Sequence, residues 1–252
     1  MEVGDKVALV TGAARGLGAA IATRLAQAGH PVVLVDQDAA VEQCALSLQS
    51  AGYVARWARL DISNEAQVMA LPALIGDWWP RLAILVNNAG ISPKHEGKKR
   101  EVIDMPLDEW RRVLDVNLTG TFLVTRTCLP VLTSHGWGRI VMITSQAART
   151  RTPVPGAHYS ATKSGMAGLA RVLAGEVAGA GVTVNCVAPG RIETSMTAGV
   201  NAEVNRQHAA GIPAGRMGTA EEVAATVAFL VSDGAGYSTG ATFDVNGGSF
   251  MH

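Results

Sequence analysis

Short apolar runs alternate along the chain with stretches whose apolar residues recur at helical spacing. The first run covers residues 6–10, and a glycine-rich segment and an amphipathic stretch follow it directly. An apolar run of this length, bounded by turn residues, is typical of a strand buried on both faces. The order repeats down the chain. It predicts an α/β fold, a Rossmann-type doubly wound parallel sheet of six or seven strands with helices on both faces.

The expected strands share an apolar middle and end in polar or glycine residues; they cover residues 6–10, 32–35, 53–60, 82–86, 140–143, 182–187 and 241–245. Helical patterns are expected at residues 19–29, 65–78, 107–132, 159–181 and 220–230. Asn117 and Gly120 are unfavourable inside a helix and predict a local kink or a water-filled site. No second domain, repeat or linker is visible, so residues 1–252 are expected to form a single domain.

A glycine-rich turn joins the first strand to the first helix. Its sequence, TGAARGLG, places Gly12, Gly16 and Gly18 where the backbone can approach a pyrophosphate at a helix start. Asp36 ends the second strand, where a carboxylate accepts hydrogen bonds from the adenosine ribose. Asp36 would repel a 2′-phosphate, so NAD(H) is favoured over NADP(H). Arg15 is the opposing observation, because a guanidinium can pair with that phosphate.

Polar residues also follow the third and fourth expected strands. Asp61 is placed to accept a hydrogen bond from an adenine amine, or else to cap the next helix. Residues 87–90, NNAG, stand at the end of the fourth strand. Ligands of open α/β sheets bind at the carboxyl ends of strands, so contact with a cofactor is expected there; a simple turn is the alternative.

A hydroxyl, a phenol and an ammonium group occur close together in residues 145–163. Tyr159 and Lys163 are four residues apart, so on a helix they lie on one face. A phenol titrates near ~10, and a neighbouring ammonium favours its ionised form, so Lys163 is expected to lower the pKa of Tyr159. Ser145 follows the fifth strand and can hydrogen-bond a carbonyl oxygen while Tyr159 exchanges a proton with it.

Composition narrows the function classes. The 21 basic and 21 acidic residues give net zero charge, which disfavours a nucleic-acid or anionic-membrane surface. The three cysteines have no ligand spacing and are expected to be reduced thiols. No basic-then-apolar leader and no long apolar run is visible, so the protein is expected to be cytoplasmic.

Taken together, the motifs resemble the short-chain dehydrogenase/reductase family over essentially the whole chain. The matching stretches are TGAARGLG, NNAG at 87–90, Asn117 in DVNLTG, Ser145, YSATK at 159–163 and PG at 189–190. The resemblance implies an NAD(P)-dependent alcohol dehydrogenase or ketone reductase, hydride transfer without a metal, and a homotetramer.

The resemblance also implies roles for individual residues. Tyr159 would be the general acid/base, Ser145 would polarise the substrate oxygen, Lys163 would lower the pKa of Tyr159 and bind the nicotinamide ribose, and Asn117 would hold a relay water. The cofactor would contact Gly12, Arg15, Leu17 and Gly18 at the pyrophosphate, Asp36, Asp61, Ile62, Asn88 and Gly90 at the adenosine half, and Tyr159, Lys163, Pro189, Ile192 and Thr194 at the nicotinamide half.

The substrate is harder to predict. The interval from Ser145 to Tyr159 is one residue longer than the family's commonest spacing, and Gln146 replaces a small residue. With Ser145, Tyr159 and Arg191, Gln146 is expected to face the substrate. Further polar side chains nearby favour a small polar molecule: a polyol, a sugar or a hydroxy acid. These side chains are Arg149, Arg151, His158 and Glu193.

Two other functions remain open. Many family members reduce 3-oxoacyl thioesters, and an NAD(H)-sensing protein could keep the fold without catalysis. Residues 195–215 mix polar and apolar residues and are expected to form a lid over the substrate. The basic run Lys94, Lys98, Lys99 and Arg100 is expected to be a solvated loop face.

Overall fold

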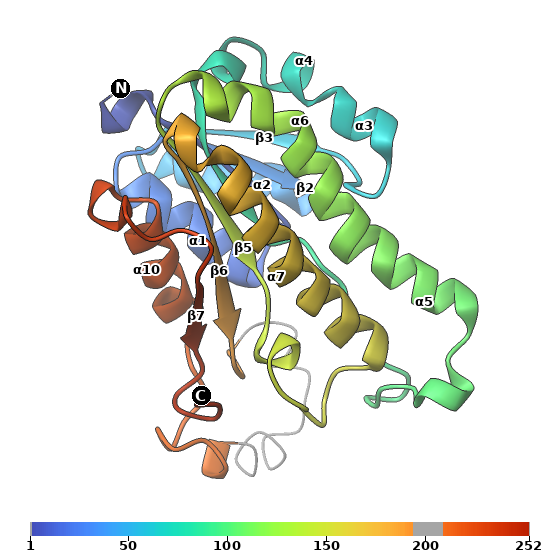
Figure 1. Cartoon of the computed structure of the whole chain (residues 1–252). Coiled ribbons are helices and arrows are strands. Elements are labelled where there is room, and N and C mark those ends of the chain that lie inside the picture. The colour runs from blue at the N-terminus through green and yellow to red at the C-terminus, as the bar shows by residue number, and fades with distance from the viewer. Residues whose placement is uncertain (1, 194–208, 252) are drawn as a thin grey trace.

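The computed structural model describes residues 2–193 and 209–251. Within them, a seven-stranded sheet has the order β3-β2-β1-β4-β5-β6-β7, and every neighbouring pair is parallel (Figure 1). The strands are β1 (Val7–Thr11), β2 (Val32–Asp36), β3 (Ala55–Arg59), β4 (Leu82–Asn87), β5 (Gly138–Ile143), β6 (Val182–Pro189) and β7 (Thr242–Val245). The expected Rossmann-type sheet is confirmed, with seven strands.

The apolar runs of the sequence form the middle of this sheet. Every residue of β1, β4, β5 and β6 is buried, because helices cover both faces. The edge strand β7 is only half-buried along its length. A strand covered on both faces gains from apolar side chains at every position, which explains why these strands do not alternate between apolar and polar residues.

The helices form one layer on each face of the sheet (Figure 1). An apolar cluster on one face takes Ile21 and Val227 from α1 and α10, and the cluster on the other takes Leu123 and Met166 from α6 and α7. The helices are α1 (Gly16–Gln27), α2 (Ala40–Ser50), α3 (Glu65–Met69), α4 (Leu71–Ile75), α5 (Leu107–Leu114), α6 (Gly120–Ser134), α7 (Ala157–Val177) and α10 (Ala220–Leu230).

Two expected helices are interrupted. The pattern over residues 65–78 divides into α3, α4 and a 3-10 turn, with a proline at the start of α4 and Pro80 inside the turn. The pattern over residues 107–132 contains a π-helical turn at Asp115–Thr119, which separates α5 from α6 and includes Asn117. The expected kink at Asn117 is therefore a local widening of the helix. Helix α10 has the predicted bounds and begins with a Thr219–Glu222 capping box.

The strand order creates a crevice beside β1. The chain continues from β1 to β2 on one side, and later places β4 on the other side of β1. Loops that leave β1 and β4 therefore diverge at the carboxyl edge of the sheet, which is where ligands of such folds bind. In Figure 1 this is the lower edge, where the start of α7 also lies.

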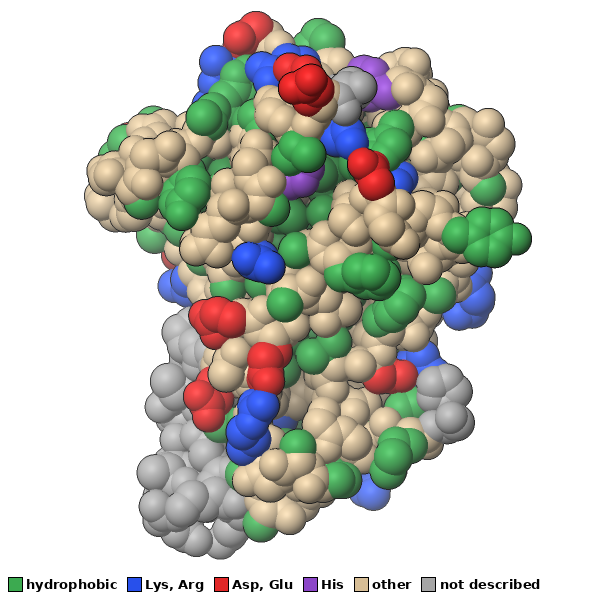
Figure 2. All heavy atoms as spheres, turned by 90° about the vertical axis from the view of Figure 1, so that its left-hand side faces the viewer, with side chains coloured by type: hydrophobic (Ala, Val, Ile, Leu, Met, Phe, Trp, Pro, Cys, Tyr) green, Lys and Arg blue, Asp and Glu red, His purple; other side chains and the backbone are tan. Residues whose placement is uncertain are grey.

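The surface carries charges of both signs. On the face that Figure 2 shows, which includes α10, acidic and basic side chains are interspersed among apolar ones. Among the helices of the described residues, none has the length and apolar character needed to cross a membrane.

Gly181 provides a test of the packing between the turns that precede β5 and β6. Its φ angle is 73°, and a Cβ atom there would lie 2.1 Å from the backbone oxygen of Gly136. We expect Gly181→Ala to lower the free energy of unfolding in urea by more than about 2 kcal/mol, because left-handed strain adds to a backbone clash. Gly179→Ala is the control, since nothing lies within 4 Å of that position. Equal stability of the two variants would contradict this packing.

Candidate active site

The turn after β1 is held by Asn88. The Asn88 side chain donates hydrogen bonds to the carbonyls of Thr11 (2.9 Å) and Gly12 (3.1 Å). In return, the Thr11 hydroxyl accepts the backbone N–H groups of Asn88 (3.0 Å) and Ala89 (3.1 Å). Gly12 and Gly16 have φ angles of 67° and 55°, which favour glycine. The side chain of Asn88 therefore lies against the glycine turn and shapes it.

Helix α1 packs directly on this turn. A Cβ atom on Gly18 would lie 2.1 Å from the Gly12 carbonyl oxygen, so only glycine permits the approach. Leu17 packs against the apolar cluster on the same face of the sheet. Arg15, the N-cap, makes no side-chain cap bond, so the first N–H groups of α1 remain suited to an anion such as a pyrophosphate.

Arg15 is turned toward a carboxylate. Its guanidinium lies 2.6 Å from Asp38 Oδ2. The Ala40 N–H and the Arg15 charge hold the pKa of Asp38 below its usual range. The guanidinium that could pair with a 2′-phosphate is therefore paired with Asp38 at the surface, where 69% of the Arg15 side chain is exposed.

Asp36 ends β2 with both carboxylate oxygens oriented by backbone groups. Oδ2 accepts the N–H of Ala14 (3.0 Å), and Oδ1 accepts the N–H of Asp38 (3.0 Å). The carboxylate is thus fixed between the glycine turn and the loop after β2.

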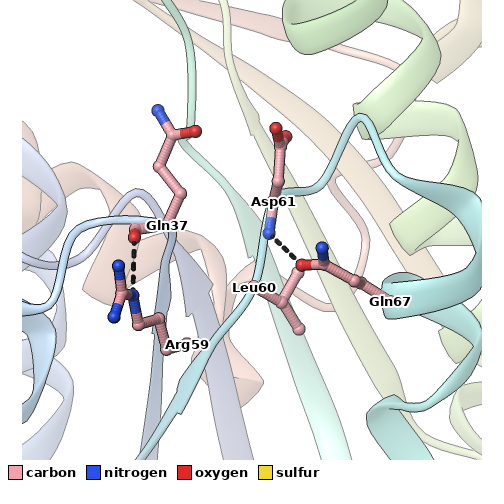
Figure 3. A pocket seen from close by; sticks show the side chains of 5 residues that line it. All are labelled: Gln37, Arg59, Leu60, Asp61 and Gln67. Atoms are coloured by element: carbon pink, nitrogen blue, oxygen red, sulfur yellow. Dashed lines mark hydrogen bonds between the residues drawn. The ribbon is translucent and has the colours of Figure 1, made fainter.

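A cavity of about 390 Å³ lies next to this acid, between the ends of β2 and β3. Figure 3 shows its lining, in which the Arg59 Nε donates to the Gln37 carbonyl (3.1 Å) and the Asp61 N–H donates to Gln67 Oε1 (2.7 Å). Sequence reasoning missed Gln37, Arg59 and Gln67, although the first two stand directly at strand ends. The lining residues are Gln37, Arg59, Leu60, Asp61 and Gln67.

The Asp61 carboxylate interacts with Ser63 and with Arg112. Burial would raise the pKa of Asp61, but hydrogen bonds from Ser63 and the charge of Arg112 outweigh burial and lower it. Asn64, rather than Asp61, caps α3, accepting the N–H of Gln67. The alternative capping role of Asp61 is therefore wrong. Ile62 is buried, and a Cβ on the neighbouring Gly120 would lie 2.8 Å from it.

Ser145 and Tyr159 meet at the end of β5. The Ser145 hydroxyl accepts the Ala147 N–H (3.1 Å), which orients it at the start of a short 3-10 turn. Tyr159 lies in the first turn of α7, and a side-chain hydrogen bond joins it to Ser145. The fourteen-residue separation in sequence is thus closed in space.

The expected pKa shift of Tyr159 is wrong in direction. Burial raises the pKa of the phenol, and the Ser145 hydrogen bond only partly opposes this. The Lys163 ammonium lies 5.7 Å from the centroid of the Tyr159 ring and donates instead to the Ile143 carbonyl (2.7 Å). Loss of hydration therefore raises the pKa of Tyr159, and the phenol is held in its protonated form.

Lys163 is a charged group in the interior. Its side chain is almost completely buried, and burial lowers its pKa to about 8. Gly90 comes close to it, because a Cβ on that glycine would lie 3.4 Å from Lys163 Nζ and 3.3 Å from Asn117 Oδ1. Gly90, Asn117 and Lys163 therefore surround one small space at the edge of the sheet.

Asn117 joins three segments. Its Oδ1 accepts the Ile91 N–H (2.7 Å), and its Nδ2 donates to the Ile91 carbonyl (2.9 Å) and to Thr162 Oγ1 (3.2 Å). The π turn widens the helix where this side chain enters the interior. In the structure Asn117 therefore ties the loop after β4 to α7.

The loop after β6 contains the remaining expected cofactor contacts. Pro189 ends β6, and Ile192 is buried and pairs with Gly218 in an isolated bridge. Burial lowers the pKa of Arg191. Thr194 and most of the expected lid, residues 195–215, lie outside the described residues.

The loop after Ser145 is anchored on the C-terminal segment. Gln146 Oε1 accepts the Ser249 hydroxyl (2.9 Å), and Gln146 Nε2 donates to the Ser249 carbonyl (3.3 Å). Arg149 lies 3.6 Å from Asp244. These polar groups, expected near the substrate, therefore fix the loop to the C-terminal segment.

The basic run is not a uniform solvated face. Lys94 donates to the Val154 carbonyl, Lys99 lies 3.6 Å from Glu101, and Arg100 donates to Glu109 (2.9 Å). The loop that carries the run is thus tied to the loop that precedes α7.

These residues fit a nicotinamide dinucleotide. The glycine turn offers a close approach at a helix start, and Asp36 and the adjacent cavity suit a ribose and an adenine. Gly90 lies beside Lys163, on the helix that also carries Tyr159.

Lys163 makes the stability of the cofactor-free protein depend on pH. Its pKa is about 8 in the fold against an ordinary value of 10.5, so between these values the unfolded chain binds more protons. Stability therefore rises with pH across this window. We expect wild type to gain about 3 kcal/mol relative to Lys163→Met as the pH is raised through it, measured by urea unfolding. A pH-independent difference between the two proteins would contradict the burial of a charged Lys163.

Known proteins resemble the chain along its length. A family model described as enoyl-(acyl carrier protein) reductase matches residues 12–249. The 3-oxoacyl-[acyl-carrier-protein] reductase FabG of Aquifex aeolicus (strain VF5) is 41% identical over 255 residues, 99% of each chain. The cis-4-hydroxycyclohexanecarboxylate dehydrogenase of Sinomonas cyclohexanicum is 38% identical, over 97% of this chain and 96% of that one.

A solved structure agrees with these relatives. It is a 3-oxoacyl-[acyl-carrier protein] reductase with bound NAD from Brucella melitensis, with a TM-score of 0.90 and 38% identity, covering 98% of this chain and 92% of that one. With the sheet order and the matched residues, these likenesses show that the chain belongs to the short-chain dehydrogenase/reductase family.

Proposed function

We propose that this protein is an NAD(H)-dependent oxidoreductase that reduces the ketone of a 3-oxoacyl thioester to a secondary alcohol. The reaction type is supported by the arrangement of Ser145, Tyr159 and Lys163, which lie together at the carboxyl edge of the sheet. The thioester substrate is supported by the Aquifex relative. We therefore prefer it to the small polar molecule expected from the sequence.

Tyr159 is the proton donor. Burial raises the pKa of Tyr159, so the phenol is protonated near neutral pH and can transfer its proton to the substrate oxygen as that oxygen gains charge. Ser145 hydrogen-bonds the same oxygen and holds it next to the phenol. When bound, the nicotinamide supplies the hydride that the carbonyl carbon receives. A protonated Tyr159 suits reduction better than oxidation, which needs a base at this position.

Lys163 offsets the charge left on Tyr159. With a pKa of about 8 the ammonium is largely protonated near neutral pH, and in the interior its field on a phenolate is weakly screened. The Ile143 carbonyl keeps the ammonium at the end of β5. Its contact with the nicotinamide ribose, and the relay water of Asn117, remain predictions.

Three cationic side chains, Lys94, Lys99 and Arg191, lie near one another, and we take the region that they form as the substrate entrance. Loss of hydration lowers the pKa of Lys94, and the charges of Lys99 and Arg191 lower it further. These side chains come from the loops after β4 and β6, on either side of Ser145. A substrate with an anionic group, such as the phosphates of a coenzyme or carrier thioester, suits this environment.

A hydroxy acid is the second candidate substrate, because the Sinomonas relative is a dehydrogenase of a hydroxycarboxylate and a carboxylate also suits the cationic entrance.

The test compares substrates and one variant. We expect oxidation of NADH with acetoacetyl-coenzyme A, followed by absorbance, and a loss of about 100-fold or more in kcat for Tyr159→Phe with unchanged NADH binding. Turnover of hydroxy acids with NAD, without activity on the thioester, would select the second candidate. Full activity of Tyr159→Phe would contradict the mechanism, and tight NADH binding without any turnover would favour a sensor.

Cofactor choice depends on Asp36. Its fixed carboxylate, with Arg15 engaged by Asp38, disfavours a 2′-phosphate. We expect Asp36→Asn to lower the preference for NADH over NADPH in kcat/KM by at least about tenfold, with Asp77→Asn as the remote control. A wild-type preference for NADPH would contradict this role of Asp36.

A further inference from the structure

The first turn of α7 is capped from within the helix. Gly156, its N-cap, has no side chain, so the first N–H groups lack the usual partner. His158 supplies one, because its Nδ1 lies 2.7 Å from the backbone N of Tyr159 and accepts that N–H. The residue that carries the phenol is thus hydrogen-bonded to its neighbour's ring.

The hydrogen bond from the Tyr159 N–H determines the tautomer of the His158 ring. Since Nδ1 accepts a hydrogen bond, the proton of the neutral ring lies on Nε2, which donates to Glu109 Oε1 (3.1 Å). His158 is 1% exposed. A Cβ on Gly156 would lie 2.7 Å from the ring, so the glycine leaves room for the imidazole.

Glu109, on α5, is the centre of this group of contacts. Its other oxygen, Oε2, accepts from His95 Nε2 (2.7 Å) and Arg100 Nε (2.9 Å). Burial would raise the pKa of Glu109, but the hydrogen bonds from His158, His95 and Arg100 outweigh it and lower the pKa. Glu109 therefore remains a carboxylate and a strong acceptor for His158.

The same contacts join the two loops around the substrate entrance. His95 and Arg100 belong to the loop after β4, and Lys94 of that loop donates to Val154 in the loop before α7. Glu109 thus connects the loop after β4, α5 and the first turn of α7.

We propose that Glu109 and His158 are positioning residues for Tyr159: the Glu109 carboxylate selects the His158 tautomer whose Nδ1 caps the Tyr159 N–H, which holds the phenol against Ser145. This inference rests on the proposed function only in that Tyr159 is the proton donor. Without the cap, the first turn frays and the phenol becomes hydrated. If the His158 ring only filled space, Asn and Gln at this position would have equal effects. If it acts as a hydrogen-bonding group, the two substitutions should differ.

Two substitutions of His158 distinguish the role of Nδ1 from the role of Nε2. In His158→Asn the amide oxygen can take the place of Nδ1 and keep the cap, while the contact with Glu109 is lost. In His158→Gln the amide nitrogen can take the place of Nε2 and keep the contact with Glu109, while the cap is lost. Glu109→Gln removes the charge at nearly constant size. Glu101→Gln is its control, because Glu101 is exposed and pairs only loosely with Lys99 at 3.6 Å.

For the variants we measure kcat, KM for the thioester, the Kd for NADH and the melting temperature. We expect His158→Gln and Glu109→Gln to lose about tenfold in kcat with unchanged NADH Kd, while His158→Asn and Glu101→Gln stay within about twofold of wild type. Wild-type kcat in His158→Gln, or equal losses in His158→Asn and His158→Gln, would overturn the proposal.

A second measurement does not require turnover. The ionisation of Tyr159 is read from tyrosinate absorbance as the difference between each protein and its Tyr159→Phe counterpart. Because burial raises the pKa of Tyr159, hydration of a frayed turn should move the titration of His158→Gln down toward about 10, and leave His158→Asn unchanged. An unchanged titration in His158→Gln overturns the positioning role. Inactive wild type with the expected titration shift would instead contradict the proposed function alone.

Discussion

The site depends on an ammonium group held in the interior at the carboxyl edge of the sheet. Lys163 is 3% exposed, and its described oxygen partner is the carbonyl of Ile143 at the end of β5. Removing a charge from water is costly unless nearby dipoles compensate for it. The lowered pKa of Lys163 shows that compensation is incomplete, so the surrounding structure must hold the charge in place.

Rigid elements supply that support. Lys163 lies on α7, which packs against the sheet from Met166 to Val177, and Gly90 leaves room for its ammonium. Asn117 enters from the π turn between α5 and α6 and ties α7 to the loop after β4. His158 and Glu109 hold the first turn of the same helix. The phenol and the ammonium are therefore positioned by one helix that is secured at several points from two neighbouring segments.

Much of the fold is predictable because strands buried on both faces require continuous apolar runs. Such a run can be recognised in the sequence without knowing which strands lie beside it. The glycine turn, Asp36 and the Tyr159–Lys163 pair are local patterns and could be found in the same way. Contacts between distant segments could not. Gln146 and Ser249 are 103 residues apart, and Glu109 and His158 are 49 apart, so no local pattern shows them. The pKa of Tyr159 was mispredicted because spacing shows the charge of a neighbour but not the loss of water around the phenol.

Direct titration of Lys163 tests the central claim that its charge is buried. The protein is labelled with 13C at the lysine ε-carbons, and Lys163→Met identifies the resonance in the cofactor-free state. A midpoint of about 8, apart from the other lysines, is the result that the structure predicts. A midpoint at the ordinary value near 10.5 would show a hydrated ammonium and contradict the account of the site.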